Sequence, residues 1–322
     1  MQHLFHNDVP PTPASDALSG AMPQNVWLVG QSRSRDQRKE RYPAGKRHSQ
    51  KMVPELARKM IEHHRLPTGS HIYDPFLGVG TTVVEGIELG YVVGGCDISP
   101  ECVEDARKNQ QAAFARKPDC VLGCLDVGDA RSLTGVTSDS VDAVVTSPPY
   151  GDCDPTRDSN GRTMASRVGT NGYLDDNLHK TAHAHEQAMF LVQGAMGSMG
   201  RYGWSSSMFL ALAEIKRILK PGKFCTLAVR SYWSRKAYNH MIDLPGITVE
   251  LGRRAGLVIY DEIYAMDAAI DRFGVLKSRG SMHQNRLARQ MQDGRPCPRG
   301  VPGVTRVLVF QKKPKKSAEE PE

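Results

Sequence analysis

Apolar residues in this chain recur with the period of a helix in some segments and in short continuous runs in others. Between residues 52 and 64 they return to one helical face, and Pro67-Thr68-Gly69 then breaks the pattern. Further on, short runs typical of buried strands alternate with amphipathic stretches typical of helices. We predict strands at 72–73, 92–96, 120–124, 141–146 and 224–229, and helices at 81–89, 100–116 and 207–219.

Strands separated by helices of this length predict a parallel sheet, because a helical crossover is the usual connection between parallel strands. Two later apolar segments, 256–265 and 304–312, are expected to pair antiparallel. The predicted fold class is therefore α/β: a doubly wound, mainly parallel sheet with a C-terminal antiparallel strand pair and long inserts. The inserts are 151–206 and 266–303, and loops this long are usually functional or disordered.

Composition narrows the class of protein further. Residues 25–312 of the 322 form the expected domain, between a disordered leader (1–24) without a signal-peptide pattern and a charged tail (313–322). No apolar run is long enough to cross a membrane. The seven cysteines show no zinc-like spacing and suggest free thiols in a reducing compartment. We expect a cytoplasmic protein that binds neither a membrane nor a metal ion.

The formal charge of +7 suits a polyanionic partner, although many unrelated proteins are equally basic. Much of this charge lies in the second insert, where arginine and lysine could neutralise phosphates or contact base edges. A solvated charged surface is the alternative interpretation. The candidate residues for binding DNA are Arg272, Lys277, Arg279, Arg286 and Arg289.

A glycine-containing loop follows the first predicted strand and opens the next helix. Its sequence is Asp74-Pro75-Phe76-Leu77-Gly78-Val79-Gly80-Thr81. Gly78 and Gly80 allow a tight turn and the close approach of a ligand. The loop lacks the Gly-Lys-Ser/Thr ending of a phosphate-binding loop, and Val83 stands where a nicotinamide fingerprint has its third glycine. A nucleotide-like ligand of another kind is therefore favoured.

Two aspartates follow the next strands at the same predicted edge of the sheet. Asp97 ends the second strand, where a carboxylate can accept hydrogen bonds from both hydroxyl groups of a ribose. Asp129 follows the third strand and could accept a hydrogen bond from an adenine amino group. Capping aspartates around an ordinary turn are the alternative for each residue alone.

The fourth strand leads into Ser147-Pro148-Pro149-Tyr150. Two prolines fix a stiff turn whose carbonyl groups point outward. Paired with the glycine loop, this tetrapeptide resembles the amino-methyltransferases of DNA, whose signature joins Asp/Asn/Ser-Pro-Pro-Tyr/Phe to Asp-Pro-Phe-x-Gly-x-Gly-Thr. The resemblance spans roughly residues 48–313.

The resemblance implies a Rossmann-like methyltransferase sheet with S-adenosylmethionine as cofactor. In this interpretation Phe76, Gly78 and Gly80 surround the cofactor, Asp97 binds its ribose, and Asp129 faces its adenine. The segment that begins at His48 resembles an N-terminal cofactor-binding motif. The implied cofactor-binding residues are His48, Asp74, Phe76, Gly78, Gly80, Thr81, Asp97 and Asp129.

The chemistry of an exocyclic amine explains the tetrapeptide. Its nitrogen is a poor nucleophile because the lone pair is delocalised into the ring. If the Ser147 hydroxyl and the Pro148 carbonyl accept its hydrogens, the lone pair can be directed at the methyl group. Pro149 would stiffen the turn, and Tyr150 would stack on a base flipped out of the duplex.

Serine at position 147 resembles the cytosine-N4 branch, whereas aspartate dominates the adenine-N6 branch. We therefore expect a site-specific methyltransferase acting on cytosine N4 in double-stranded DNA, with target recognition on the C-terminal side. It would form part of a restriction-modification system whose endonuclease acts separately. The alternatives are an adenine-N6 enzyme, an RNA amino-methyltransferase, a glutamine-modifying protein methyltransferase, and a nucleic-acid-binding protein that has lost catalysis.

Overall fold

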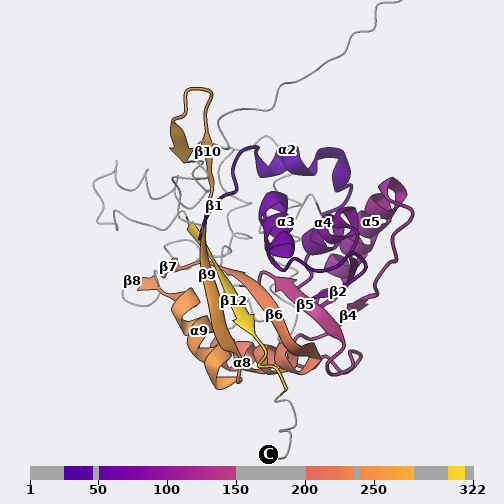
Figure 1. Cartoon of the computed structure of the whole chain (residues 1–322), viewed down its shortest axis with the longest axis vertical. Helices are drawn as coiled ribbons and strands as arrows, with labels where there is room; N and C mark the ends of the chain where they lie inside the picture. Colours follow the sequence, from indigo (N-terminus) through magenta and orange to yellow (C-terminus); the bar gives the residue numbers. More distant parts are fainter. Residues whose placement is uncertain (1–24, 46–50, 150–200, 235–239, 279–303, 316–322) are drawn as a thin grey trace, which may run out of the picture.

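The structure, a computed structural model, describes residues 25–45, 51–149, 201–234, 240–278 and 304–315 (Figure 1). Its centre is an eight-stranded sheet with the strand order β1-β9-β12-β6-β5-β2-β3-β4. The strands are β1 (Val26–Leu28), β2 (His71–Asp74), β3 (Val92–Asp97), β4 (Leu125–Val127), β5 (Val141–Thr146), β6 (Leu219–Val229), β9 (Val258–Met266) and β12 (Val304–Gln311). Only β12 runs against the direction of the others in this sheet.

Helices cover both faces of the sheet (Figure 1). The helices are α2 (Ser34–Arg38), α3 (Pro54–His63), α4 (Thr81–Leu89), α5 (Pro100–Arg116), α8 (Arg201–Ile218) and α9 (Leu244–Arg254), with a 3-10 turn, η1 (Lys39–Arg41), after α2. On β5, Ala143 and Val145 pack into the apolar cluster that contains α3, α4 and α5, whereas Val144 packs into the cluster of α8 and α9. This alternation buries both faces of β5 and confirms the doubly wound α/β fold.

Several elements have the predicted bounds because strong local signals mark their ends. Both α4 and α5 match the prediction, and so does β5. Gly90 ends α4 in the left-handed region at φ +90°, where a side chain would be strained. The Ser99 hydroxyl caps α5 by accepting a hydrogen bond from Cys102 N at 3.4 Å. The predicted antiparallel pair of β9 and β12 is also confirmed.

The strand predicted at 120–124 is wrong, since β4 begins only at Leu125. The backbone of the predicted segment is engaged in another way. Gly95 N donates to Cys124 O at 3.0 Å, and the Gln110 side chain donates to Gly123 O at 2.8 Å. A short run of apolar residues suggested a strand there, but the regular pairing with β3 starts only at Leu125.

The boundaries around α8 also differ from the prediction. This helix begins at Arg201, so the first insert, predicted to extend to Ser206, gives way to helix earlier than expected. Lys220, Pro221 and Gly222, which separate the predicted helix 207–219 from the predicted strand 224–229, lie within β6, where the pairing with β5 shifts register between Val141 and Ala143. Gly222 has a φ of +76°, which accommodates this irregular start of the strand.

The sequence pattern predicts none of β1, α2, η1, α9 and the two small hairpins. Helix α9 contains Pro245, Gly246 and β-branched residues that disfavour helices, and it is stabilised by packing of Leu244 and Leu251 against the sheet. Two small hairpins also lie outside the main sheet: β7 (Tyr232–Ser234) with β8 (His240–Ile242), and β10 (Ala268–Ile270) with β11 (Leu276–Ser278). Among the described helices, none combines the length and apolar character needed to span a membrane.

Candidate active site

The glycine loop and the Pro-Pro turn begin at the ends of two neighbouring strands. Parallel pairing joins β2 to β5 through Ile72–Ala143 and Tyr73–Val144. Asp74 ends β2, and its carboxylate accepts hydrogen bonds from Phe76 N at 3.0 Å and from the hydroxyl group of Thr146 at the end of β5. The two loops therefore lie side by side at the carboxyl edge of the sheet, where open α/β sheets bind their ligands.

Asp74 is only 2% exposed. Burial raises its pKa to about 6, although hydrogen bonds from Thr146, Thr82 and the backbone of Phe76 oppose this rise. A buried carboxylate with several donors orders the loop around it. Asp74 thus supports the site from beneath rather than facing solvent.

The glycine loop makes the tight turn that its sequence predicts. Gly78 and Gly80 have positive φ values of 50° and 76°. A Cβ atom at Gly80 would lie 3.1 Å from Ala106 Cβ on α5. The Asn109 side chain also donates to Val79 O at 2.8 Å and holds the turn against α5. The backbone therefore forms a narrow cradle that larger residues would distort.

Asp97 joins the glycine loop to β3. Its Oδ2 atom accepts a hydrogen bond from Gly78 N at 2.8 Å, and its Oδ1 atom accepts one from Ser99 N at 3.0 Å. Burial raises the pKa of Asp97, although these backbone donors oppose the rise. Each carboxylate oxygen has a second lone pair, so the carboxylate can still accept ribose hydroxyl groups as predicted.

Asp129 forms an ion pair that the sequence did not suggest. Arg131 donates to its carboxylate from Nη2 at 2.6 Å, from Nε at 2.9 Å and from its backbone N at 2.9 Å. Although partial burial opposes ionisation, these hydrogen bonds lower the pKa of Asp129. Arg131 also donates to the Ser207 hydroxyl of α8 at 3.3 Å. Asp129 can therefore face an adenine only in directions that Arg131 leaves open.

The Pro-Pro turn presents its hydrogen-bond acceptors next to the glycine loop. The Ser147 hydroxyl donates to Ala228 O of β6 at 3.3 Å. Because its hydrogen is donated inward, the lone pairs of the Ser147 oxygen can accept a hydrogen from a substrate. No hydrogen bond to the Pro148 carbonyl occurs among the residues that the structure describes.

Trp204 of α8 holds the other end of the turn, and sequence reasoning missed it. Its Nε1 atom donates to Pro149 O at 2.6 Å, and the residue is 1% exposed. This contact fixes the second proline through a buried aromatic ring. The signal available in the sequence was weak, because a tryptophan on an amphipathic helix is usually an ordinary core residue.

Arg38 of α2 is the second residue that the sequence analysis missed. It is 8% exposed, and its Nη2 atom donates to Met52 O at 2.5 Å and to the Thr81 hydroxyl at 2.9 Å. Its Nε and Nη1 atoms are buried and have no hydrogen-bond partner among the described residues. A buried donor without a partner costs about 1–3 kcal/mol, so this group is suited to receive an acceptor.

Other predicted site residues are placed only in part. Arg272 and Lys277 belong to the β10–β11 hairpin, and Arg272 Cζ lies 4.7 Å from the centre of the Phe273 ring. Phe273 is 74% exposed at the tip. The remaining residues, His48, Tyr150, Arg279, Arg286 and Arg289, lie outside the described part of the chain, as do residues 151–200 of the first insert and 279–303 of the second.

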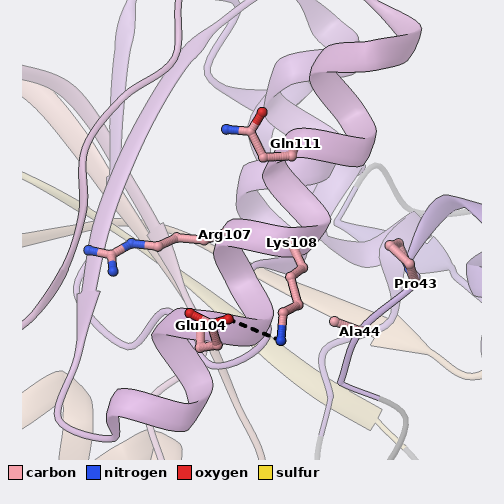
Figure 2. Close-up of a pocket in the computed structure, with 6 residues that line it drawn as sticks. All are labelled: Pro43, Ala44, Glu104, Arg107, Lys108 and Gln111. Carbon is pink, nitrogen blue, oxygen red and sulfur yellow. Dashed lines mark ion pairs between the residues drawn. The ribbon is translucent and has the colours of Figure 1, made fainter.

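A hollow of about 450 Å³ lies elsewhere, on the outer side of α5. Figure 2 shows Lys108 directed toward Glu104, whereas Arg107 points away from this pair. The Glu104–Lys108 ion pair has a separation of 3.0 Å. The hollow is lined by Pro43, Ala44, Glu104, Arg107, Lys108 and Gln111. It contains none of the predicted site residues and is not the cofactor site.

Comparison with known proteins supports the interpretation of the glycine loop and Asp97 as part of a cofactor site. Residues 14–108 match the family model described as DNA methylase. The matched range includes the glycine loop and Asp97 but ends before Ser147. It covers less than half of the chain.

Curated relatives are similar over short regions. The tRNA (guanine(10)-N2)-dimethyltransferase of Methanothermobacter thermautotrophicus is 37% identical over 100 residues, which are 31% of this chain and 28% of that protein. The Type II methyltransferase M.MvaI of Kocuria varians is 45% identical over 51 residues, 15% of this chain and 11% of that protein. The chain thus spans less than a third of the length of either relative.

A TehB-like SAM-dependent methyltransferase from Corynebacterium glutamicum is one of the similar solved structures. The alignment covers 80% of this chain and 87% of that protein's chain, with 16% identity and a TM-score of 0.40. The sheet order and the matched family give the chain a Rossmann-like methyltransferase fold. The prediction of S-adenosylmethionine as cofactor is confirmed, and the glycine cradle and Asp97 fit that molecule.

Proposed function

We propose that this protein transfers a methyl group from S-adenosylmethionine to the exocyclic N4 atom of cytosine in double-stranded DNA. One observation carries the proposal: the Pro-Pro turn follows β5, and the glycine loop follows the neighbouring strand β2. The hydrogen bond from Thr146 to Asp74 joins the ends of these two strands. Acceptors for an amine and the cradle for a methyl donor then share one edge of the sheet. When bound, the cofactor supplies an electrophilic sulfonium methyl group.

The residues of the turn would activate the amine. The Ser147 oxygen, with its hydrogen donated to Ala228 O, would accept one amine hydrogen, and the Pro148 carbonyl would accept the other. Both contacts favour a tetrahedral nitrogen whose lone pair is directed at the methyl group. Trp204 supports the turn through Pro149 O and would keep the acceptors in place. Serine at position 147 favours cytosine N4 over adenine N6.

The DNA would lie across the carboxyl edge of the sheet. The β10–β11 hairpin follows β9, which ends at the same edge as β5 and β6 because the three strands run in one direction. The exposed Arg272 would contact a phosphate group. Lys277, Arg279, Arg286 and Arg289 are proposed to extend this contact, and His48 and Thr81 to complete the cofactor site. We also propose that a separate restriction endonuclease shares the recognition sequence.

An RNA substrate is the second candidate, because the curated relatives include a tRNA (guanine(10)-N2)-dimethyltransferase. The N2 atom of guanine is also an exocyclic amine, and the same acceptors could activate it. The chain covers 28% of the length of that relative.

One experiment separates these possibilities. The protein is incubated with S-adenosylmethionine labelled in its methyl group and, separately, with unmethylated genomic DNA or unmodified tRNA, and the products are digested to nucleosides. Label in N4-methylcytosine supports the proposal, and label in N6-methyladenine moves the function to the other DNA branch. Label found only with tRNA, or cofactor binding without any transfer, contradicts it.

A further inference from the structure

The guanidinium group of Arg38 is the most unusual polar group in the described core. It is covered by Tyr42, whose ring centre lies 4.5 Å from Arg38 Cζ, and it reaches Thr81 and Met52 with a single nitrogen atom, Nη2. The other two nitrogen atoms are shielded from solvent and lack partners among the described residues. Buried arginine normally has its donors satisfied, so this arrangement indicates a ligand.

The nearest acidic side chain does not supply that partner. Glu85 of α4 is 1% exposed, and its carboxylate is already shared by three donors. Arg41 Nη2 and the Tyr42 hydroxyl donate to Oε1, both at 2.7 Å, while Arg58 Nε donates to Oε2 at 3.1 Å. Glu85 is therefore bound elsewhere, and Arg38 remains a cation with unused donors.

The position of Arg38 identifies the kind of ligand. Thr81, which it contacts, is the first residue of α4 and directly follows Gly80 of the cofactor loop. The N-terminus of a helix favours negative charge, because its first amide groups lack partners within the helix. A buried cation and a helix N-terminus thus meet at one end of the glycine loop.

S-adenosylmethionine carries a single anionic group, the carboxylate of its methionine part. Asp97, at the end of β3, suits the ribose, and Asp129, in the loop after β4, suits the adenine. The sulfonium is positive and would be repelled by arginine. We propose that Arg38 binds the carboxylate of the cofactor through one of its unused donors, Nε or Nη1, which donates to a carboxylate oxygen. Because both nitrogen atoms are covered, binding requires a local rearrangement where α2 meets α4.

Two nucleosides that differ by one carboxylate test this inference, which rests on the cofactor site and not on the nucleic acid. Binding of S-adenosylhomocysteine and of decarboxylated S-adenosylhomocysteine is measured by calorimetry. We expect Arg38→Met to weaken the binding of S-adenosylhomocysteine about 10- to 100-fold. The affinity for the decarboxylated compound should change less than about twofold. Arg38→Lys should show a smaller loss with the same selectivity.

Arg116→Met is the matched control, because Arg116 pairs with Glu88 at 2.8 Å and lies away from the glycine loop. It should leave both affinities unchanged. If the Arg38 variants lose affinity for both compounds equally, Arg38 has a structural role and the inference fails. Unchanged affinity for S-adenosylhomocysteine would also overturn the inference. Wild-type protein that binds neither compound would overturn the cofactor site as well. Binding without methyl transfer would contradict only the proposed function.

Discussion

The carboxylate of Asp74, the last residue of β2, accepts a hydrogen bond from the hydroxyl group of Thr146, the last residue of β5. Each residue precedes one of the two loops that define the site. Their contact fixes the distance between the glycine loop and the Pro-Pro turn without involving a ligand. The geometry on which the proposed methyl transfer depends is therefore built into the core of the sheet.

The titration of Asp74 should make stability depend on pH in an unusual direction. The folded pKa is raised to about 6 from an ordinary value of 3.8, so the protonated form stabilises the fold below about pH 4. This contribution is lost as the pH rises through 6. Relative to Asp74→Asn, the unfolding free energy of wild type should fall by up to about 3 kcal/mol between pH 4 and 7. Urea unfolding at each pH measures this difference, and a constant difference would contradict the assignment.

Replacement of Ser147 should separate binding from chemistry. We expect Ser147→Ala to retain cofactor affinity but to lose turnover by about 10²–10³-fold, because one acceptor for the amine is removed. Ser140→Ala provides a matched control, since the Ser140 hydroxyl donates to Thr137 O in a distant turn. Calorimetry and single-turnover rates give the two quantities. Parallel loss of affinity and rate would mean that Ser147 supports the fold of the site.

Trp204→Phe tests the support of the Pro-Pro turn while keeping an aromatic ring in the core. The Pro149 carbonyl would lose its donor, which should destabilise the protein by about 1–3 kcal/mol. We expect kcat to fall and the KM for the cofactor to stay unchanged. Chemical unfolding and steady-state kinetics check these outcomes. An unchanged kcat at reduced stability would show that the turn keeps its geometry without the indole.

The β10–β11 hairpin should contribute two different kinds of interaction with DNA. Arg272→Gln should lower the slope of log affinity against log salt by about one, because one phosphate contact is lost. Phe273→Ala should weaken binding about tenfold without changing the slope, if the exposed ring stacks on a base. Titrations of a labelled duplex over a range of salt concentrations distinguish the two effects.

Tyr260→Ala is the control for the loss of an exposed aromatic ring, since Tyr260 is 63% exposed near the opposite end of β9. It should leave both the affinity and the salt dependence unchanged. If Tyr260→Ala and Phe273→Ala weaken binding equally, the hairpin has no specific role.

The sequence predicted the parts of the fold whose signals lie within a few residues of one another. Gly80, Gly90 and Ser99 mark the ends of α4 and α5, and the structure has these helices where they were expected. Helix α9 depends on burial of Leu244 and Leu251 against distant strands, so its local sequence carries little signal for a helix. The start of β4 similarly depends on its register with β3.

For the candidate site, residues carried by strand ends could be predicted, because parallel strands bring their carboxyl ends to one edge. Arg38 and Trp204 could not be predicted in this way. Arg38 reaches Thr81 across 43 residues of chain, and Trp204 reaches Pro149 across 55. Their roles follow from packing between separate helices and loops, which no local pattern records.

The position of β12 between β6 and β9 has a consequence for synthesis of the protein. The strands β2 to β5 precede residue 150 and can pair as soon as they emerge from the ribosome. In contrast, β9 and the early strand β1 join the sheet only through residues 304–311. Until translation reaches that point, β6 presents an unpaired edge that could associate with other chains. The order of the strands along the chain therefore leaves this edge of β6 open until late in synthesis.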